Sequence, residues 1–213
     1  MIVLPNECLS EILKKLESYC RSLFSCLLVN RQWCRIVVPI LWSKLNISKN
    51  QKLIRRCLLT LNTEEQAQLI PFKINLPNDS RSLFNYTDYT TVFNIDWDDG
   101  IKNWLKHDFN NLKNSEIIHV VQAIRHSLIL MILRTSKNLK CLSIYGKQVN
   151  LPKILDKCAT LTSLNLSFND LDFEELKALA TALYENTTLN KLDISGNELD
   201  SEKVKVLTEV LYF

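Results

Sequence analysis

The sequence is poor in glycine, with only Gly100, Gly146 and Gly196 among 213 residues. A glycine-rich phosphate loop and a dinucleotide-binding fingerprint each need several closely spaced glycines, because the backbone must approach the phosphates. Neither motif can be written anywhere in this chain. The scarcity of glycine therefore removes support for most classes of nucleotide-dependent enzyme.

Paired metal ligands are also lacking. The seven cysteines contain no C-x-x-C pair, and the three histidines do not supply the missing spacing. Structural zinc sites and disulfide frameworks use closely spaced or paired ligands. We therefore expect free, buried thiols, with no metal and no cofactor.

Long apolar runs are absent as well. The longest, residues 128–133, is far shorter than the roughly 20 residues that cross a bilayer. The N-terminus reaches Pro5 and Glu7 before an apolar segment develops, which is not the pattern of a signal peptide. We expect no membrane partner and a reducing cytoplasmic or nuclear location.

The composition is that of a globular protein, with 46% hydrophobic and 23% charged residues. Charge is unevenly distributed, because residues 1–60 hold 10 Lys and Arg against 3 Asp and Glu. This basic segment predicts a docking surface for nucleic acid, anionic lipid or an acidic protein, and charge alone does not choose among them. Nucleic acid is the least favoured partner, since the basic residues between 44 and 56 have little aromatic interleaving.

Internal repetition is strongest at the C-terminal end. The segment LTSLNLSFNDL at residues 161–171 recurs as LNKLDISGNEL at residues 189–199. The apolar residues that follow each segment repeat 28 positions apart with the spacing of a helix that buries one face. These pairs are Leu176 and Val204, Leu179 and Leu207, and Leu183 and Leu211. Each unit is therefore predicted to be a short strand, a turn and an amphipathic helix.

The two units resemble leucine-rich repeats of the long, ribonuclease-inhibitor-like type, L-x-x-L-x-L-x-x-N-x-L. The resemblance implies parallel strands in a short curved solenoid, with Asn169 and Asn197 bonding the backbone of the turns. An earlier unit that starts at Leu139 has Lys147 in place of the asparagine, and we interpret it as a degenerate or capping repeat.

Alternate strand positions of such a solenoid lie on its concave face. They form the candidate client-binding surface, which consists of Tyr145, Ser163, Asn165, Ser167, Lys191, Asp193 and Ser195. The alternative is that these polar side chains only keep the face soluble.

Residues 4–42 carry a second pattern. Pro5 followed by Glu7 favours a helix start, and apolar spacing predicts three short helices, from Pro5 to about Ser18, over residues 23–29 and over residues 32–42. So small a bundle cannot easily bury all its Leu, Ile, Val and Trp side chains. A partner would cover the apolar side chains that remain exposed.

The order of residues in this segment, L-P-x-E-x-L-x-x-I-x-x-x-L from residue 4, then V-N-R-x-W from residue 29 and a final L-W, resembles an F-box. The segment departs from the usual pattern by about two extra residues before Val29 and by Asn30 in place of the commoner Cys or Ser. The resemblance implies docking on the Skp-type adaptor of SCF ubiquitin ligases. The implied adaptor-binding residues are Leu4, Pro5, Glu7, Ile12, Leu13, Leu16, Val29, Arg31, Trp33 and Trp42. The alternative is that the apolar residues are merely the inner core of a helical cap.

The middle of the chain has fewer recognisable sequence patterns. Residues 72–76 alternate like a strand, and residues 117–128 form a helical stripe. The acids Asp88, Asp96, Asp98 and Asp99 raise the alternative of a hydrolase. An EF-hand is excluded because Gly100 stands fifth rather than sixth from Asp96, and no nucleophile or base can be matched to these acids.

The sequence therefore predicts an α/β protein with a three-helix F-box at residues 1–45, a linker with irregular early repeats at 46–135, and leucine-rich repeats at 136–213. The combined order resembles F-box/leucine-rich-repeat proteins. The resemblance implies a non-catalytic substrate-recognition subunit of an SCF-type E3 ubiquitin ligase, which binds a Skp-type adaptor, through it a cullin, and a client protein through the repeats. A stand-alone leucine-rich-repeat scaffold is the alternative.

Overall fold

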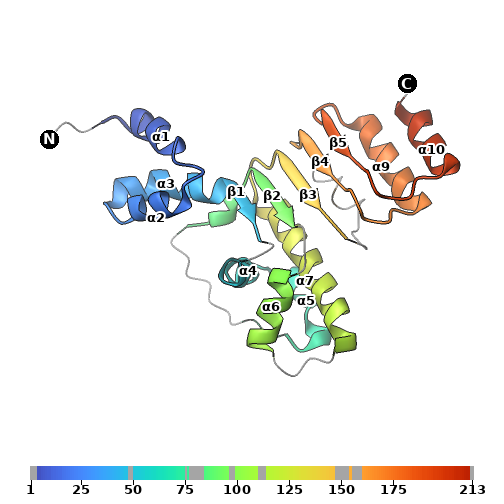
Figure 1. Ribbon diagram of the computed structural model, residues 1–213, viewed down its shortest axis with the longest axis horizontal. Helices are drawn as coiled ribbons and strands as arrows, with labels where there is room; N and C mark the ends of the chain where they lie inside the picture. Colours follow the sequence, from blue (N-terminus) through green and yellow to red (C-terminus); the bar gives the residue numbers. More distant parts are fainter. Residues whose placement is uncertain are drawn as a thin grey trace.

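The structure is a computed structural model, in which a parallel sheet is flanked by helices and a helical module lies at its N-terminal end (Figure 1). It describes residues 4–47, 50–74, 76, 84–95, 99–109, 114–146, 154 and 160–211.

Three helices form the N-terminal module, as the sequence predicts: α1 (Asn6–Lys14), α2 (Cys20–Leu27) and α3 (Arg31–Ser43). Asn30 caps α3, because its side chain accepts a hydrogen bond of 2.9 Å from the backbone N–H of Trp33. The unusual residue at position 30 therefore has a structural role. Five buried side chains fill the module's own core, namely Leu9, Leu13, Leu23, Val37 and Ile40.

Five parallel strands follow one another across one sheet, in the order β1-β2-β3-β4-β5. The strands are β1 (Lys44–Asn46), β2 (Val92–Ile95), β3 (Cys141–Ile144), β4 (Ser163–Asn165) and β5 (Lys191–Asp193). One in-register row points into the core and consists of Leu45, Phe93, Leu142, Leu164 and Leu192. Beside it runs a polar row of Asn46, Asn94, Ser143, Asn165 and Asp193. The predicted α/β solenoid is confirmed.

Helices connect the strands, because parallel neighbours need a crossover. The first crossover contains α4 (Gln51–Leu58), α5 (Thr63–Ala67) and the short 3₁₀ helices η1 (Ile70–Phe72) and η2 (Tyr86–Tyr89). The second contains α6 (Asp99–Asp108) and α7 (Asn114–Thr135). In the last two repeats, α9 (Phe173–Glu185) and α10 (Ser201–Leu211) follow β4 and β5.

The middle of the chain is part of the solenoid. It supplies β2 and the helices α4 to α7, which lie below the sheet in the view of Figure 1. The strand predicted at residues 72–76 is wrong, because residues 70–72 form η1 and Lys73 turns the backbone with a φ of 57°. β3 lies between β2 and β4, so the unit at Leu139 is an interior repeat and not a cap.

Helix α7 is the one helix within the described residues that is long and apolar enough to cross a membrane by length and composition, over Glu116–Thr135. Slightly more than half of that segment, 56%, is buried in the fold. Val120, Ile124 and Leu128 are fully buried in the same core as the strand residues. The helix therefore packs as the central helix of the solenoid.

Candidate interaction surfaces

Exposed apolar side chains are concentrated in the N-terminal module. Six of the twelve exposed large hydrophobic residues in the described part of the chain lie between residues 4 and 29. We call them the N-terminal apolar surface: Leu4, Ile12, Tyr19, Phe24, Leu28 and Val29. Leu28 is 78% exposed and Phe24 is 62% exposed. Folding alone leaves this area in water, which marks an interaction site rather than a core.

Half of this surface is missing from the sequence prediction. Tyr19, Phe24 and Leu28 were not among the implied adaptor-binding residues. The signal that could have found Phe24 and Leu28 is the doubled apolar pattern of α2 and its C-cap residue, in which Leu23 and Leu27 pack inward while Phe24 and Leu28 follow one position later. A helix with apolar residues on two faces has one face more than its own module can bury.

The implied adaptor-binding residues divide into three groups. Leu4, Pro5, Glu7, Ile12, Val29 and Arg31 are exposed. Leu16 and Trp33 are half-buried against the module's core. Leu13 is a correction: it is only 1% exposed, so it supports the surface from within and does not present itself to a partner.

Trp42 is a second correction. Its ring stacks on Tyr86 of η2, with ring centroids 4.7 Å apart and planes 25° apart, and it packs against the core of the solenoid. The guanidinium of Arg56 lies over the Tyr86 ring, 5.2 Å from its centroid. Trp42 therefore joins the module to the solenoid, a structural role that the implied adaptor contact did not include.

Polar contacts fix the same joint. Helix α3 passes directly into β1 at Lys44. The Lys44 ammonium lies 3.2 Å from the Glu17 carboxylate, and the Ser43 hydroxyl donates to the same carboxylate at 3.4 Å. Thr91, just before β2, donates its backbone N–H to the Ser43 carbonyl at 2.8 Å. The module is thus anchored to the first two strands.

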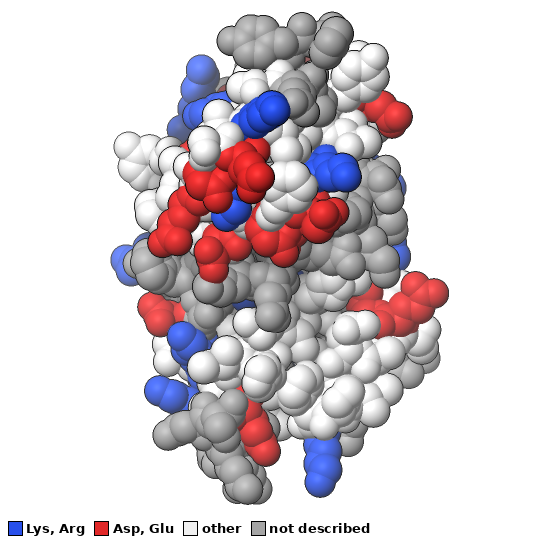
Figure 2. All heavy atoms as spheres, turned by 90° about the vertical axis from the view of Figure 1, so that its right-hand side faces the viewer, with Lys and Arg blue, Asp and Glu red and all other residues white. Residues whose placement is uncertain are grey.

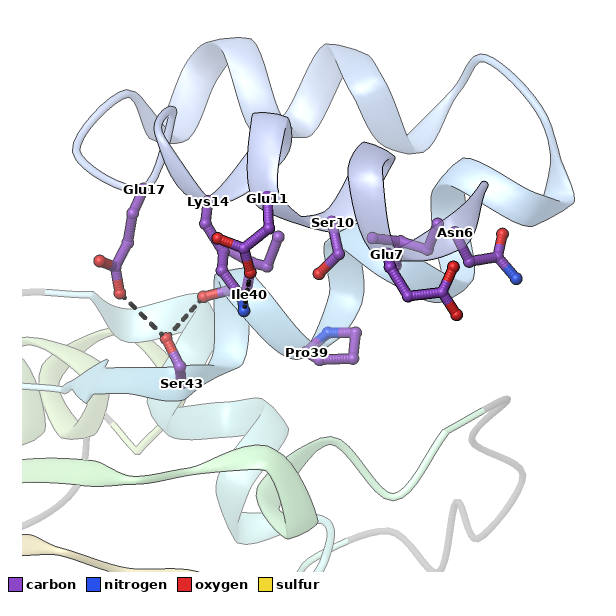
Figure 3. A pocket seen from close by; sticks show the side chains of 10 residues that line it. Asn6, Glu7, Ser10, Glu11, Lys14, Glu17, Pro39, Ile40 and Ser43 are labelled. Atoms are coloured by element: carbon purple, nitrogen blue, oxygen red, sulfur yellow. Dashed lines mark hydrogen bonds and ion pairs between the residues drawn. The ribbon is translucent and has the colours of Figure 1, made fainter. Parts of the chain in front are cut away.

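A groove separates α1 from α3 (Figure 3). Its walls come from α1 and the turn after it and from α3, and consist of Asn6, Glu7, Ser10, Glu11, Lys14, Glu17, Ile36, Pro39, Ile40 and Ser43. The Lys14 ammonium donates to Glu11 at 2.7 Å and lowers the pKa of that carboxyl. Among these lining residues no histidine or cysteine stands beside a hydroxyl, so the groove offers no nucleophile and base pair.

The concave face of the solenoid carries a hydrogen-bonded polar chain across three strands. The Asn165 amide donates to the Tyr145 hydroxyl at 3.0 Å and to the Asp193 carboxylate at 3.1 Å. Asp193 in turn accepts from the Ser195 hydroxyl at 2.7 Å, and the Ser195 hydrogen bonds lower the pKa of the Asp193 carboxyl. The hydrogen bonds therefore hold these side chains in fixed positions.

The structure places most of the predicted client-binding residues on this face. Tyr145, Ser163, Asn165 and Asp193 are half-buried, and Lys191 and Ser195 are exposed. Ser167 is a correction, because it is only 3% exposed and its hydroxyl donates to the Asn165 side chain at 2.7 Å. Ser167 orients Asn165 and does not face a client.

The two repeat asparagines have the structural role that the repeat resemblance implies. Asn197, 1% exposed, donates to the carbonyls of Leu166 and Ile194 at 2.9 and 2.7 Å. Its side-chain oxygen accepts from the backbone N–H groups of Asn169 and Leu171. Asn169 donates likewise to the carbonyl of Ile144 at 2.8 Å. These bonds tie each turn to the preceding repeat.

The acids of the hydrolase alternative do not form a cluster where they are described. Asp88 is engaged by the Lys137 ammonium at 2.7 Å, and Asp99 lies in the first turn of α6. Asp96 and Asp98 fall outside the described residues. In the part of the chain that the structure describes, no group of three His, Cys, Asp or Glu side chains could hold a metal ion.

The six cysteines within the described residues are free, but their burial is not uniform. Cys57 is fully buried, and burial raises the pKa of its thiol to about 12. Cys8 and Cys20 are exposed, so the prediction of burial is wrong for these two. They lie on α1 and α2, which leave much of their surface in water.

The two ends of the molecule differ in charge. Residues 161–208 hold nine Asp and Glu against four Lys, and acidic side chains gather on the face that carries α9 and α10 (Figure 2). Residues 1–60, by contrast, hold 10 Lys and Arg against 3 Asp and Glu. A partner of the N-terminal end and a partner of the C-terminal end should therefore have different surface charges.

A helical module with an exposed apolar surface and a short solenoid with a polar concave face define a protein-interaction architecture. Two family models match the chain: the F-box-like model matches residues 1–48, and the Leucine Rich repeat model matches residues 157–180 and 185–203. The chain thus carries an F-box-like segment at its N-terminus and leucine-rich repeats towards its C-terminus. No curated protein and no solved structure matches it.

Proposed function

We propose that this protein is a substrate-recognition adaptor of an SCF-type E3 ubiquitin ligase. The N-terminal apolar surface docks a Skp-type adaptor and through it a cullin, and the concave face of the solenoid holds a client protein. The observation that supports this most directly is the concentration of exposed apolar side chains on the segment that the F-box-like model matches.

The N-terminal apolar surface has the energetics of a docking site. Full burial of a Phe or Leu side chain contributes about 1.5–3 kcal/mol. Phe24 of α2 and Leu28, the C-cap residue of α2, are both left mostly exposed by folding. A few buried apolar anchors usually dominate such an interface. The exposed Arg31 and Arg35 add charge complementarity to an acidic adaptor.

The mechanism of such an adaptor is proximity, so the chain has no catalytic step of its own. Holding the client near the ubiquitin-loaded enzyme raises the effective concentration of the reacting groups. The joint at Trp42 and Tyr86 supports this function, because it fixes the distance between the adaptor end and the client end. The free thiols fit a reducing cytoplasmic or nuclear compartment.

Co-purification with a Skp-type adaptor tests the proposal. We expect the wild-type chain to form a stoichiometric complex and the Phe24→Asp, Leu28→Asp double variant to lose it, because each change puts a charge into an apolar contact. The matched control is Ile70→Asp, which alters an exposed apolar residue outside the module and should leave binding intact. Circular dichroism confirms that all variants are folded.

Two results would contradict the adaptor role. One is no complex with folded wild-type chain, which would favour a stand-alone leucine-rich-repeat scaffold. The other is equal binding by the wild type and the double variant.

The client site is the polar chain of Tyr145, Asn165 and Asp193. Asn165→Arg places a large cation in the centre of this chain and should remove client proteins from those captured with the wild type, while adaptor binding is kept. Quantitative mass spectrometry of both captures measures the difference. Identical client sets would exclude the concave face as the client site.

A further inference from the structure

The groove between α1 and α3 has an apolar floor opposite a polar wall. Ile36 and Pro39 of α3 are half-buried on this floor, and Ile40 beside them is 9% exposed. Ser10 and Glu11 of α1 face them across the groove (Figure 3). Because the facing α1 side chains are polar, the module does not cover the apolar floor with apolar side chains of its own. An apolar strip that is rimmed by polar residues is typical of a binding groove.

The charge of this groove is opposite to that of the surrounding sequence. Residues 1–60 hold 10 Lys and Arg against 3 Asp and Glu, and all three acids line the groove, namely Glu7, Glu11 and Glu17. Lys14 is the one cation among the lining residues. The groove therefore has a net negative charge within a basic module, and it favours a partner of positive charge.

The carboxylates differ in how far the chain itself engages them. Lys14 donates to Glu11 at 2.7 Å, and the Lys44 ammonium lies 3.2 Å from Glu17. Glu7 is exposed and has no ion pair within the part of the chain that the structure describes. Glu11 retains acceptor positions, because an ionised carboxylate has about four lone-pair sites. Glu7 and Glu11 lie one helical turn apart on α1, with Cβ atoms about 6 Å apart, and so offer two neighbouring acceptor groups.

Side-chain hydrogen bonds fix the two ends of the groove. At one end the Gln32 amide of α3 donates to the Asn6 side chain of α1 at 2.7 Å. At the other end the Ser43 hydroxyl of α3 donates to Glu17 at 3.4 Å. The volume of the groove is about 700 Å³, within the range of about 300–1,000 Å³ that is usual for binding sites. Because the spacing of the two walls is fixed, binding requires little further ordering of them.

We propose that this groove binds a short basic amphipathic segment of a partner protein. The apolar side chains of that segment pack on Ile36 and Pro39, and its Lys or Arg side chains pair with Glu7 and Glu11. The groove lies apart from the N-terminal apolar surface, since Ile12 is about 140° around the α1 axis from Glu7. This site is therefore additional to the proposed adaptor and client sites, and its occupation depends on neither.

Fluorescence anisotropy of a labelled nine-residue peptide of alternating Lys and Leu, titrated with the full chain, tests the proposal. We expect saturable binding, and Glu11→Lys should raise the dissociation constant at least about tenfold because it replaces an attraction by a repulsion. The same variant should bind a peptide of alternating Glu and Leu more tightly than the wild type does. A peptide of alternating Lys and Ser should bind the wild type at least about tenfold more weakly, because it leaves the apolar floor uncovered.

The matched control is Glu64→Lys, the same charge reversal at an exposed acid of α5 that does not line the groove. It should leave the dissociation constant unchanged. Circular dichroism verifies that both variants are folded. Since the pair of Lys14 and Glu11 is exposed, its loss should not unfold α1.

Two results of the titration would overturn the proposal. One is no saturable binding of the peptide of Lys and Leu up to about 1 mM. The other is equal binding by the wild type and Glu11→Lys, which would place the peptide on another acidic surface, such as the face that carries α9 and α10 (Figure 2).

Two competing occupants are distinguished by further measurements. Glu7 is the one implied adaptor-binding residue that lines the groove, so displacement of the peptide by a saturating Skp-type adaptor would overturn the proposal and make the groove part of the adaptor contact. Sedimentation equilibrium tests for a second copy of the chain, and a dimer that Glu11→Lys dissociates would also overturn it. A chain that binds the peptide but no adaptor would leave this proposal standing while the adaptor role fails.

Discussion

Replacement of Asn197 by alanine should destabilise the solenoid strongly although the residue touches no partner. Truncation removes two donor bonds, to the Leu166 and Ile194 carbonyls, and two acceptor bonds, from the Asn169 and Leu171 N–H groups. At about 1 kcal/mol for each hydrogen bond, the expected loss is about 4 kcal/mol. This is a large fraction of the 5–15 kcal/mol by which domains are usually stable.

Guanidinium denaturation followed by far-UV circular dichroism measures this loss as a shift in the transition midpoint. The matched control is Asn190→Ala in the same repeat, where the side chain is exposed and the free energy of unfolding should change by less than about 0.5 kcal/mol. If Asn197→Ala unfolds within about 1 kcal/mol of the wild type, the asparagine bonds are not what holds the turns together.

Three more outcomes follow from the described contacts. Trp42→Ala removes the stack on Tyr86 and should lower the free energy of unfolding by about 3 kcal/mol. A melting temperature equal to that of the wild type would refute the claim that this stack holds the N-terminal module on the solenoid. Glu65→Gln breaks the ion pair in which Glu65, 3% exposed, lies 2.7 Å from Arg134, and should cost about 1–3 kcal/mol in the same denaturation assay; no change would mean that the pair adds nothing to the α5 and α7 contact. At pH 8, iodoacetamide should modify Cys8 and Cys20 within minutes and spare Cys57, because a thiol with a pKa of about 12 stays protonated; mass spectrometry that finds Cys57 labelled in the folded chain would contradict its burial.

The C-terminal repeats could be predicted because their apolar spacing recurs 28 positions apart. The first two strands could not be found by the same route, since partner positions from β1 to β2 and from β2 to β3 are 48 and 49 residues apart. Each interval holds several helices, which hides the period. A shorter signal was available: Leu45-Asn46-Ile47 and Phe93-Asn94-Ile95 share the apolar-polar-apolar order of Leu164-Asn165-Leu166.

The direction in which each side chain points could not be predicted from the sequence either. The helical spacing of the N-terminal module is correct, but spacing does not tell which apolar residue meets a distant part of the chain. Trp42 turns toward Tyr86, which lies 44 positions later, and Leu13 turns into the module's core. Phe24 and Leu28 remain outside because Leu23 and Leu27 already fill the inner face of α2.

The most direct test of the adaptor role is amide hydrogen exchange of the full chain, with and without a Skp-type adaptor. Binding should slow exchange in α1 and α2, whose amides lie beneath Ile12, Phe24 and Leu28, and should leave exchange in α9 and α10 unchanged. Unchanged exchange in the N-terminal module, or protection confined to the solenoid, would contradict the assignment of the adaptor to the N-terminal end.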